Sequence, residues 1–103
     1  MDSRLDLQSK LVDLLGSDHV YFQPPESIRM KYPCFVYERS SMDTDLADDT
    51  KYLNKMRYEL MYISKEPDTN ALIKEVIESF RYCSYTRHFI SDGLNHEVFD
   101  LYY

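Results

Sequence analysis

Carboxylates form the densest group of chemically useful side chains in this sequence, within the segment DTDLADDT. They are Asp43, Asp45, Asp48 and Asp49. Clustered carboxylates suit Ca²⁺, but an EF-hand loop needs glycine at its sixth position and glutamate at its twelfth, where Asp48 and Asn54 stand instead. The pattern favours a solvated acidic loop. An adventitious ion site and the metal centre of a small hydrolase are the alternatives.

The histidines and cysteines offer no second metal site. His19, His88 and His96 have no ligand-like spacing with Cys34 or Cys83. The cysteines lack a local sign of a thiolate-stabilising environment, and we interpret both as small buried hydrophobic residues rather than a disulfide or redox pair. We therefore predict no metal and no cofactor.

Nucleophilic catalysis and nucleotide binding find no support either. Ser40 and Ser41 lack the glycine-flanked turn of a nucleophile elbow. A phosphate-binding loop needs several positions without a Cβ atom, and the chain has only two glycines. These absences predict a protein that is not an enzyme and acts through its shape, surface and assembly.

Composition limits the remaining classes. The length of 103 residues is that of one domain, which spans 1–103. The chain has ten tyrosines and no tryptophan, and tyrosine is typical of half-buried sheet faces and protein interfaces. A net charge of −6 argues against a nucleic-acid grip. We find no apolar run of membrane-spanning length and no hydrophobic signal core, so we expect no membrane partner and an intracellular protein at synthesis.

Hydrophobic periodicity predicts the elements that position these residues. The expected ranges are a helix over 3–15, a short strand over 19–22, strands over 34–41 and 52–64, a helix from about residue 69 to 80, and strands over 85–91 and 94–102. Within the 52–64 strand, the side chains at 58, 60 and 62 share one face. The order α-β-β-β-α-β-β predicts an α+β fold, with both helices on one face of a largely antiparallel or mixed sheet of about four to five strands.

Local signals mark the element ends. Ser3 and Asp6 resemble a capping pair for the first helix, which Gly16 closes. Asp68 or Thr69 is expected to cap the second helix. Its apolar stripe comprises Leu72, Ile73, Val76, Ile77 and Phe80.

An Asp-Gly pair between the last two extended runs predicts a hairpin. Asp92 and Gly93 suit a turn in which both residues have positive φ. A two-residue turn at this point places His88 opposite Glu97.

A proline-rich segment interrupts the first two strands in VYFQPPESIRMKYPCFVYERS. Proline fixes φ and lacks an N–H donor, so this segment can hold an extended path at low entropic cost without joining a sheet. We predict an interface arm that includes Gln23, Pro24, Pro25, Tyr32 and Pro33.

The sequence resembles tail terminator (tail completion) proteins of long-tailed bacteriophages over nearly its full length. The matching positions are Gln23-Pro24-Pro25, Tyr32-Pro33-Cys34, Lys65-Glu66-Pro67-Asp68, Asp92-Gly93-Leu94-Asn95-His96 and Leu101-Tyr102-Tyr103. The resemblance implies a virion protein, assembled in the host cytoplasm, that forms a ring, usually of six copies, on the end of the tail tube. It also implies that the ring stops tube polymerisation and joins the tail to the head.

The implied partners are further copies of the chain, the tail tube protein and a head-completion or connector protein. On this reading the arm lies at subunit boundaries. The aspartates at 43, 45, 48 and 49 line a channel through which DNA passes without specific binding, or else form an outward-pointing solvated loop. Another neck component, such as a head completion or stopper protein, and an acidic inhibitor that mimics nucleic acid are the alternative functions.

Overall fold

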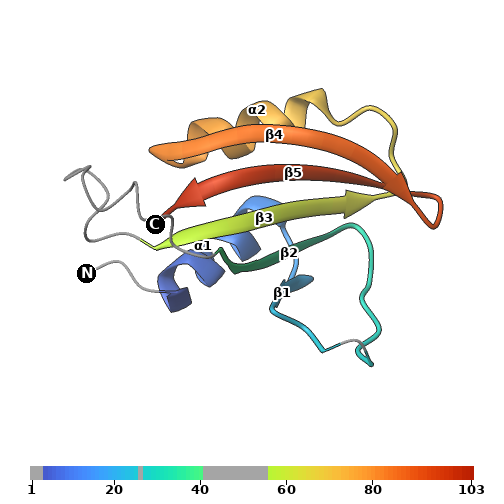
Figure 1. The fold of residues 1–103 in the computed structure, drawn as a ribbon, viewed down its shortest axis with the longest axis horizontal. Coiled ribbons are helices and arrows are strands. Elements are labelled where there is room, and N and C mark those ends of the chain that lie inside the picture. Colours follow the sequence, from blue (N-terminus) through green and yellow to red (C-terminus); the bar gives the residue numbers. More distant parts are fainter. Residues whose placement is uncertain (1–3, 26, 41–55) are drawn as a thin grey trace.

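The computed structural model describes residues 4–25, 27–40 and 56–103, which form two helices and one five-stranded sheet (Figure 1). The elements are α1 (Arg4–Leu15), β1 (Val20–Phe22), β2 (Cys34–Arg39), β3 (Arg57–Ser64), α2 (Asn70–Ser79), β4 (Tyr82–Ser91) and β5 (Leu94–Tyr102). The strands lie in the order β1-β2-β3-β5-β4, and the β1–β2 pair is parallel whereas the other pairs are antiparallel. The predicted α+β fold and element order are confirmed.

Helix α1 packs through its leucine stripe. Leu7 and Leu11 are fully buried. The helix ends at Gly16, whose φ is +81° and whose N–H donates to the Val12 carbonyl at 2.9 Å. Glycine reaches this left-handed conformation without the strain that a Cβ atom adds, as the sequence predicted. Ser3, the expected cap, lies outside the described residues.

Helix α2 differs from its predicted form at its start and along its stripe. Thr69 occupies the N-cap position, but its side chain makes no capping hydrogen bond, so the prediction of a side-chain cap is wrong. The Thr69 hydroxyl donates instead to the Glu97 carboxylate at 2.8 Å. Within the helix only Val76 is fully buried, while Ile73 and Ile77 are partly exposed because the sheet covers only part of the stripe.

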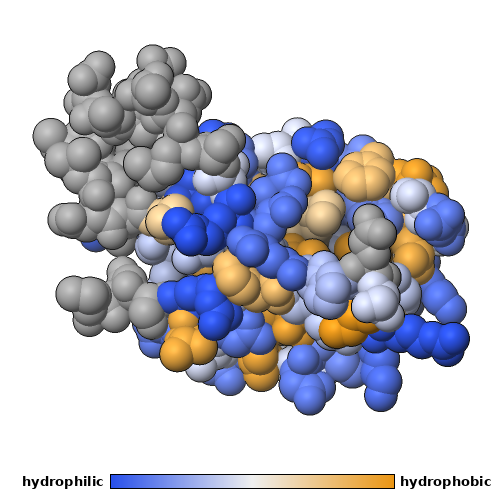
Figure 2. Space-filling model, turned by 60° about the horizontal axis from the view of Figure 1, so that its bottom comes forward, coloured by the Kyte–Doolittle hydropathy of each residue, from blue (hydrophilic) through white to orange (hydrophobic). Residues whose placement is uncertain are grey.

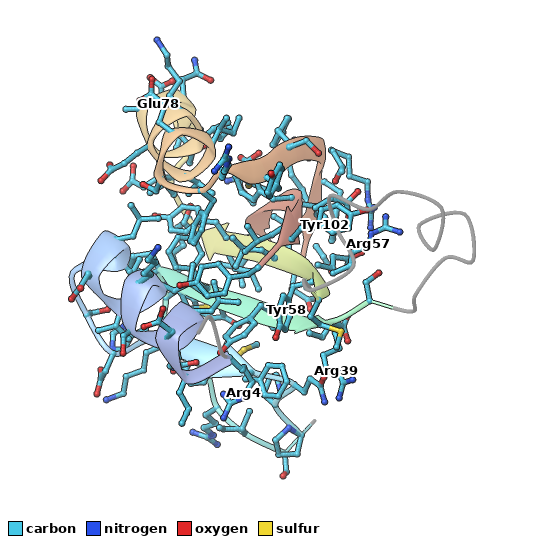
Figure 3. All side chains as sticks on the ribbon, turned by 90° about the vertical axis from the view of Figure 1, so that its left-hand side faces the viewer. Arg4, Arg39, Arg57, Tyr58, Glu78 and Tyr102 are labelled. Carbon is cyan, nitrogen blue, oxygen red and sulfur yellow. The ribbon has the colours of Figure 1, made fainter. Side chains whose placement is uncertain are left out.

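The two helices lie on the same face of the sheet, as the end-on view in Figure 3 shows. Their buried side chains join one core with those of the strands. This helix-side core contains Leu7, Leu11, Val20, Phe35, Tyr37, Tyr58, Leu60, Tyr62, Val76, Phe80, Phe99 and Leu101. The predicted shared face of 58, 60 and 62 is therefore confirmed. A smaller core on the other face contains Cys34, Val36 and Ile63.

The C-terminal hairpin has the predicted turn and register. Asp92 and Gly93 have φ values of +55° and +75°. His88 pairs with Glu97, which confirms the expected register. Strand β4 begins at Tyr82 rather than at residue 85, and a bulge interrupts its pairing between residues 85 and 87. Strand β3 begins at Arg57, so Met56 lies outside it, and 52–55 of the predicted strand lie outside the described residues.

Candidate functional site

The proline-rich arm, residues 23–33, begins where β1 ends. Gln23 has a φ of +43°, and its N–H donates to the Tyr37 carbonyl at 2.9 Å. Its side-chain Oε1 accepts a hydrogen bond from the Arg39 N–H at 3.2 Å. Gln23 therefore extends the pairing with β2 by one residue through its backbone and by a further contact through its side chain. The left-handed φ then turns the chain into the two prolines.

The arm loops out beyond β1 and returns to the start of β2 (Figure 1). The Lys31 N–H donates to the Tyr21 hydroxyl at 3.0 Å, which ties the arm to β1. Met30 packs against the smaller core formed by Cys34, Val36 and Ile63. Two attachments thus fix the inner side of the arm, and its outer side is left to face solvent or another molecule.

A hollow opens between the arm and the end of β3. Its volume is about 560 Å³, and its lining comprises Met30, Lys31, Tyr32, Pro33, Ser64, Lys65 and Glu66. Tyr32 in this lining and Ile28 elsewhere on the arm are exposed large hydrophobic residues. On this side of the molecule hydrophobic side chains form small patches separated by hydrophilic ones (Figure 2). Mixed apolar and charged surface of this kind suits a protein contact better than a buried small-molecule site.

The predicted arm residues lie at the two ends of the arm, after β1 and before β2. Gln23, Pro25, Tyr32 and Pro33 are exposed, and Pro24 is half-buried. The second predicted group, the aspartates at 43, 45, 48 and 49, lies outside the described residues.

The cysteine thiols are protected from reaction. Cys34 is fully buried and Cys83 is half-buried, and both are free. Burial raises the pKa of Cys34 to about 12, and burial together with the Asp100 carboxylate raises the pKa of Cys83 to about 12. Neither thiol is ionised at neutral pH, and the thiolate is the nucleophilic form.

A buried carboxylate joins three elements at the start of α2. Glu97 on β5 is only 4% exposed. It accepts hydrogen bonds at 2.8 Å from the Thr69 hydroxyl and at 2.8 Å from the Tyr85 hydroxyl on β4. Partial burial and the Glu97 carboxylate raise the pKa of Tyr85 to about 12, so this hydroxyl remains a donor at neutral pH. The arrangement holds the N-terminus of α2 onto the hairpin.

His88 stands at the edge of this carboxylate group. Its Nε2 lies 2.9 Å from Asn95 Oδ1 and 4.0 Å from Glu97 Oε2. The sequence predicted the pairing of His88 with Glu97 but missed Thr69 and Tyr85. Regular alternation does not place Tyr85 on the same face as His88, the pairing partner of Glu97; the bulge between residues 85 and 87 brings it there. Thr69 comes from a remote part of the chain. Within the described ranges we find no group of three or more metal-ligating side chains.

Two further findings bear on the class of protein. No helix in the described part of the chain is long and apolar enough to cross a membrane. Comparison of the chain with protein-family models, curated proteins and solved structures returned no match.

Proposed function

We propose that this chain is a structural virion protein that forms a ring on the end of a phage tail tube. The ring stops tube polymerisation and provides the surface that joins the tail to the head. The proposal rests on the resemblance to tail terminator proteins, which runs through the chain from the first proline pair to the C-terminus. The partners are further copies of the chain, the tail tube protein and a head-completion or connector protein.

One observation in the fold supports an assembly role for the arm. The arm is attached to β1 and to the smaller core, while its Ile28 and Tyr32 side chains remain exposed. An arm already held in place loses little conformational entropy when a neighbour contacts it. Ring subunits meet through two different surfaces, and the arm supplies one of them.

The arm is tested with purified tail tubes and the tail tube protein of the same genome. The unchanged protein should cap tube ends and stop their growth, as measured by tube length and by electron microscopy of the ends. Replacing both Ile28 and Tyr32 with serine should weaken capping without loss of folding. Leu5→Ser is the matched control, because Leu5 is an exposed apolar residue on α1. Normal capping by the double variant would remove the arm from the mechanism, and failure of the unchanged protein to cap would refute the function.

In the proposed ring, the acidic segment lines the channel through which DNA passes. Replacing the aspartates at 43, 45, 48 and 49 with lysine should slow genome ejection at low salt, because DNA then adheres to the wall. Moderate salt should relieve the delay, since screening shortens the reach of the charges to about 8 Å. Unchanged ejection would assign the loop to the outer surface.

A further inference from the structure

The two edges of the sheet differ in how far their backbone groups are already used. The β1 edge is short and covered: the Val20 N–H donates to the Asp18 carbonyl at 2.8 Å, and the Val20 carbonyl accepts from Gln8 Nε2 of α1 at 3.1 Å. Strand β4 forms the opposite edge, and no other strand in the described part of the chain pairs with its outer side (Figure 1). A long open edge is a template for pairing with another strand.

The bulge makes the outward groups of β4 symmetric about the middle of the strand. In a two-residue hairpin the pair next to the turn, Ser91 and Leu94, is bonded, and bonded and non-bonded residues then alternate. Ile90 and His88 therefore direct their backbone groups outward. Beyond the extra residue Thr86 the alternation shifts, so that Tyr85 and Cys83 face outward.

The four outward residues form two matching pairs about the strand's midpoint. His88 and Tyr85 lie equally far from the point between residues 86 and 87, and so do Ile90 and Cys83. When two copies of β4 run antiparallel about this point, His88 of each copy faces Tyr85 of the other, and Ile90 faces Cys83. Because the bulge shifts the alternation, this is the one register in which each of the four residues faces another residue whose backbone groups also point outward.

The side chains of the same four residues share the helix face of the sheet. Cys83 and Tyr85 pair with Leu101 and Phe99 of the helix-side core. Ile90 is 66% exposed and Tyr85 is 38% exposed, so apolar side chains remain accessible along the β4 edge, beside which α2 lies (Figure 1). Pairing of two edges covers these side chains in both copies at once.

We propose that two copies of this chain associate across a two-fold axis by antiparallel pairing of their β4 edges, joining two five-stranded sheets into one. The pairing supplies about eight backbone hydrogen bonds, two for each of the four facing pairs. Stable protein interfaces carry about ten, so the edge provides nearly a full complement before side chains are counted.

The charge on the edge sets how the pairing responds to salt. Arg87 lies beside the axis and faces Thr86 of the other copy, so the two guanidinium groups are diagonal neighbours. Their repulsion weakens the pair at low salt, and screening reduces it. Dimerisation should therefore strengthen as salt rises from a low to a moderate concentration.

This pairing goes beyond the proposed ring, because a two-fold contact closes on itself. It uses the β4 edge, whereas the arm lies beside β1 at the other end of the strand order. Self-association of the free protein and capping of tubes are thus separate measurements, and either proposal can fail without the other.

Sedimentation velocity of the full chain over a range of concentrations tests the surface. Ile90→Lys should weaken the dimer about a hundredfold, because one apolar contact is lost in each copy and two charges are placed in the interface. Leu5→Lys is the matched control, since Leu5 is 67% exposed on α1 and Ile90 is 66% exposed. A protein that stays monomeric at every concentration, or a dimer that Ile90→Lys and Leu5→Lys affect equally, would overturn the proposal.

Residue-resolved amide hydrogen exchange tests the register. The amides of Cys83, Tyr85, His88 and Ile90 should exchange more slowly as the protein concentration rises, because they become bonded only in the pair. The Phe89 amide, which faces β5 in the single chain, should keep its exchange rate apart from any effect of overall stability. Dimerisation that leaves the four outward amides unprotected would place the contact on another surface.

Discussion

Replacing Glu97 should destabilise the domain through the two hydroxyl groups that it holds. The carboxylate is 4% exposed and accepts from Thr69 and Tyr85, each at 2.8 Å. Hydrogen bonds to a charged group contribute about 1.5–3 kcal/mol each. Thr69 is only 8% exposed, so its hydroxyl has no ready replacement partner, whereas the 38% exposed Tyr85 can turn to water.

The magnitude follows from this difference in exposure. Glu97→Ala loses most of the stabilisation from the hydrogen bond at Thr69, part of that from the hydrogen bond at Tyr85, and some packing. This loss of stability is partly offset because no carboxylate charge remains to be buried. We expect a loss of about 3–4 kcal/mol, a large share of the roughly 5–15 kcal/mol typical of a domain. Glu97→Gln should cost only about 1 kcal/mol, because a hydroxyl can also accept from the amide N–H.

Urea denaturation followed by circular dichroism measures both variants, and a double-mutant cycle isolates the contact. Thr69→Val removes the donor at similar size, and its coupling energy with Glu97→Ala should be about 1–2 kcal/mol. Equal stability of the wild-type protein and Glu97→Ala, or a coupling energy below about 0.5 kcal/mol, would refute a stabilising role for this contact.

Three further outcomes follow from burial and backbone geometry. Val76→Asp should prevent cooperative folding because Val76 is fully buried, whereas Ile77→Asp at a half-buried site should lower the free energy of unfolding and leave a folded protein, as urea titration will show. Gly93→Ala should cost about 1 kcal/mol, since φ is +75° and no atom lies within 4 Å of the added methyl group; a neutral result would contradict the strain. The pKa of Cys34 is raised from 9.0 to about 12, so the folded state keeps a proton that the unfolded state loses. The free energy of unfolding should therefore fall as the pH rises between these two values. Cys34→Ala should reduce this dependence of the free energy of unfolding on pH, as measured by urea titrations at several alkaline pH values. An unchanged dependence would assign it to other titrating groups.

Local patterns predicted the parts of the fold that depend on neighbours in the chain. A two-residue turn sets the register of the strands beside it, so the Asp-Gly pair was enough to place His88 opposite Glu97. Alternation likewise assigned Tyr58, Leu60 and Tyr62 to one face of β3. The arm's exposed surface was also expected, but its attachment through Met30 and Lys31 was not.

The sequence by itself determined which faces of the helices and strands are apolar and where the final hairpin turns, because these features follow from periodicity and backbone preference over a few residues. Only the tertiary structure decided how completely each face is covered: Val76 is buried whereas Ile77 on the same stripe remains partly exposed. It also decided that Thr69 bonds Glu97 instead of capping α2. Coverage and hydrogen-bond partners depend on which remote groups come within reach, and a local pattern contains no information about those distances.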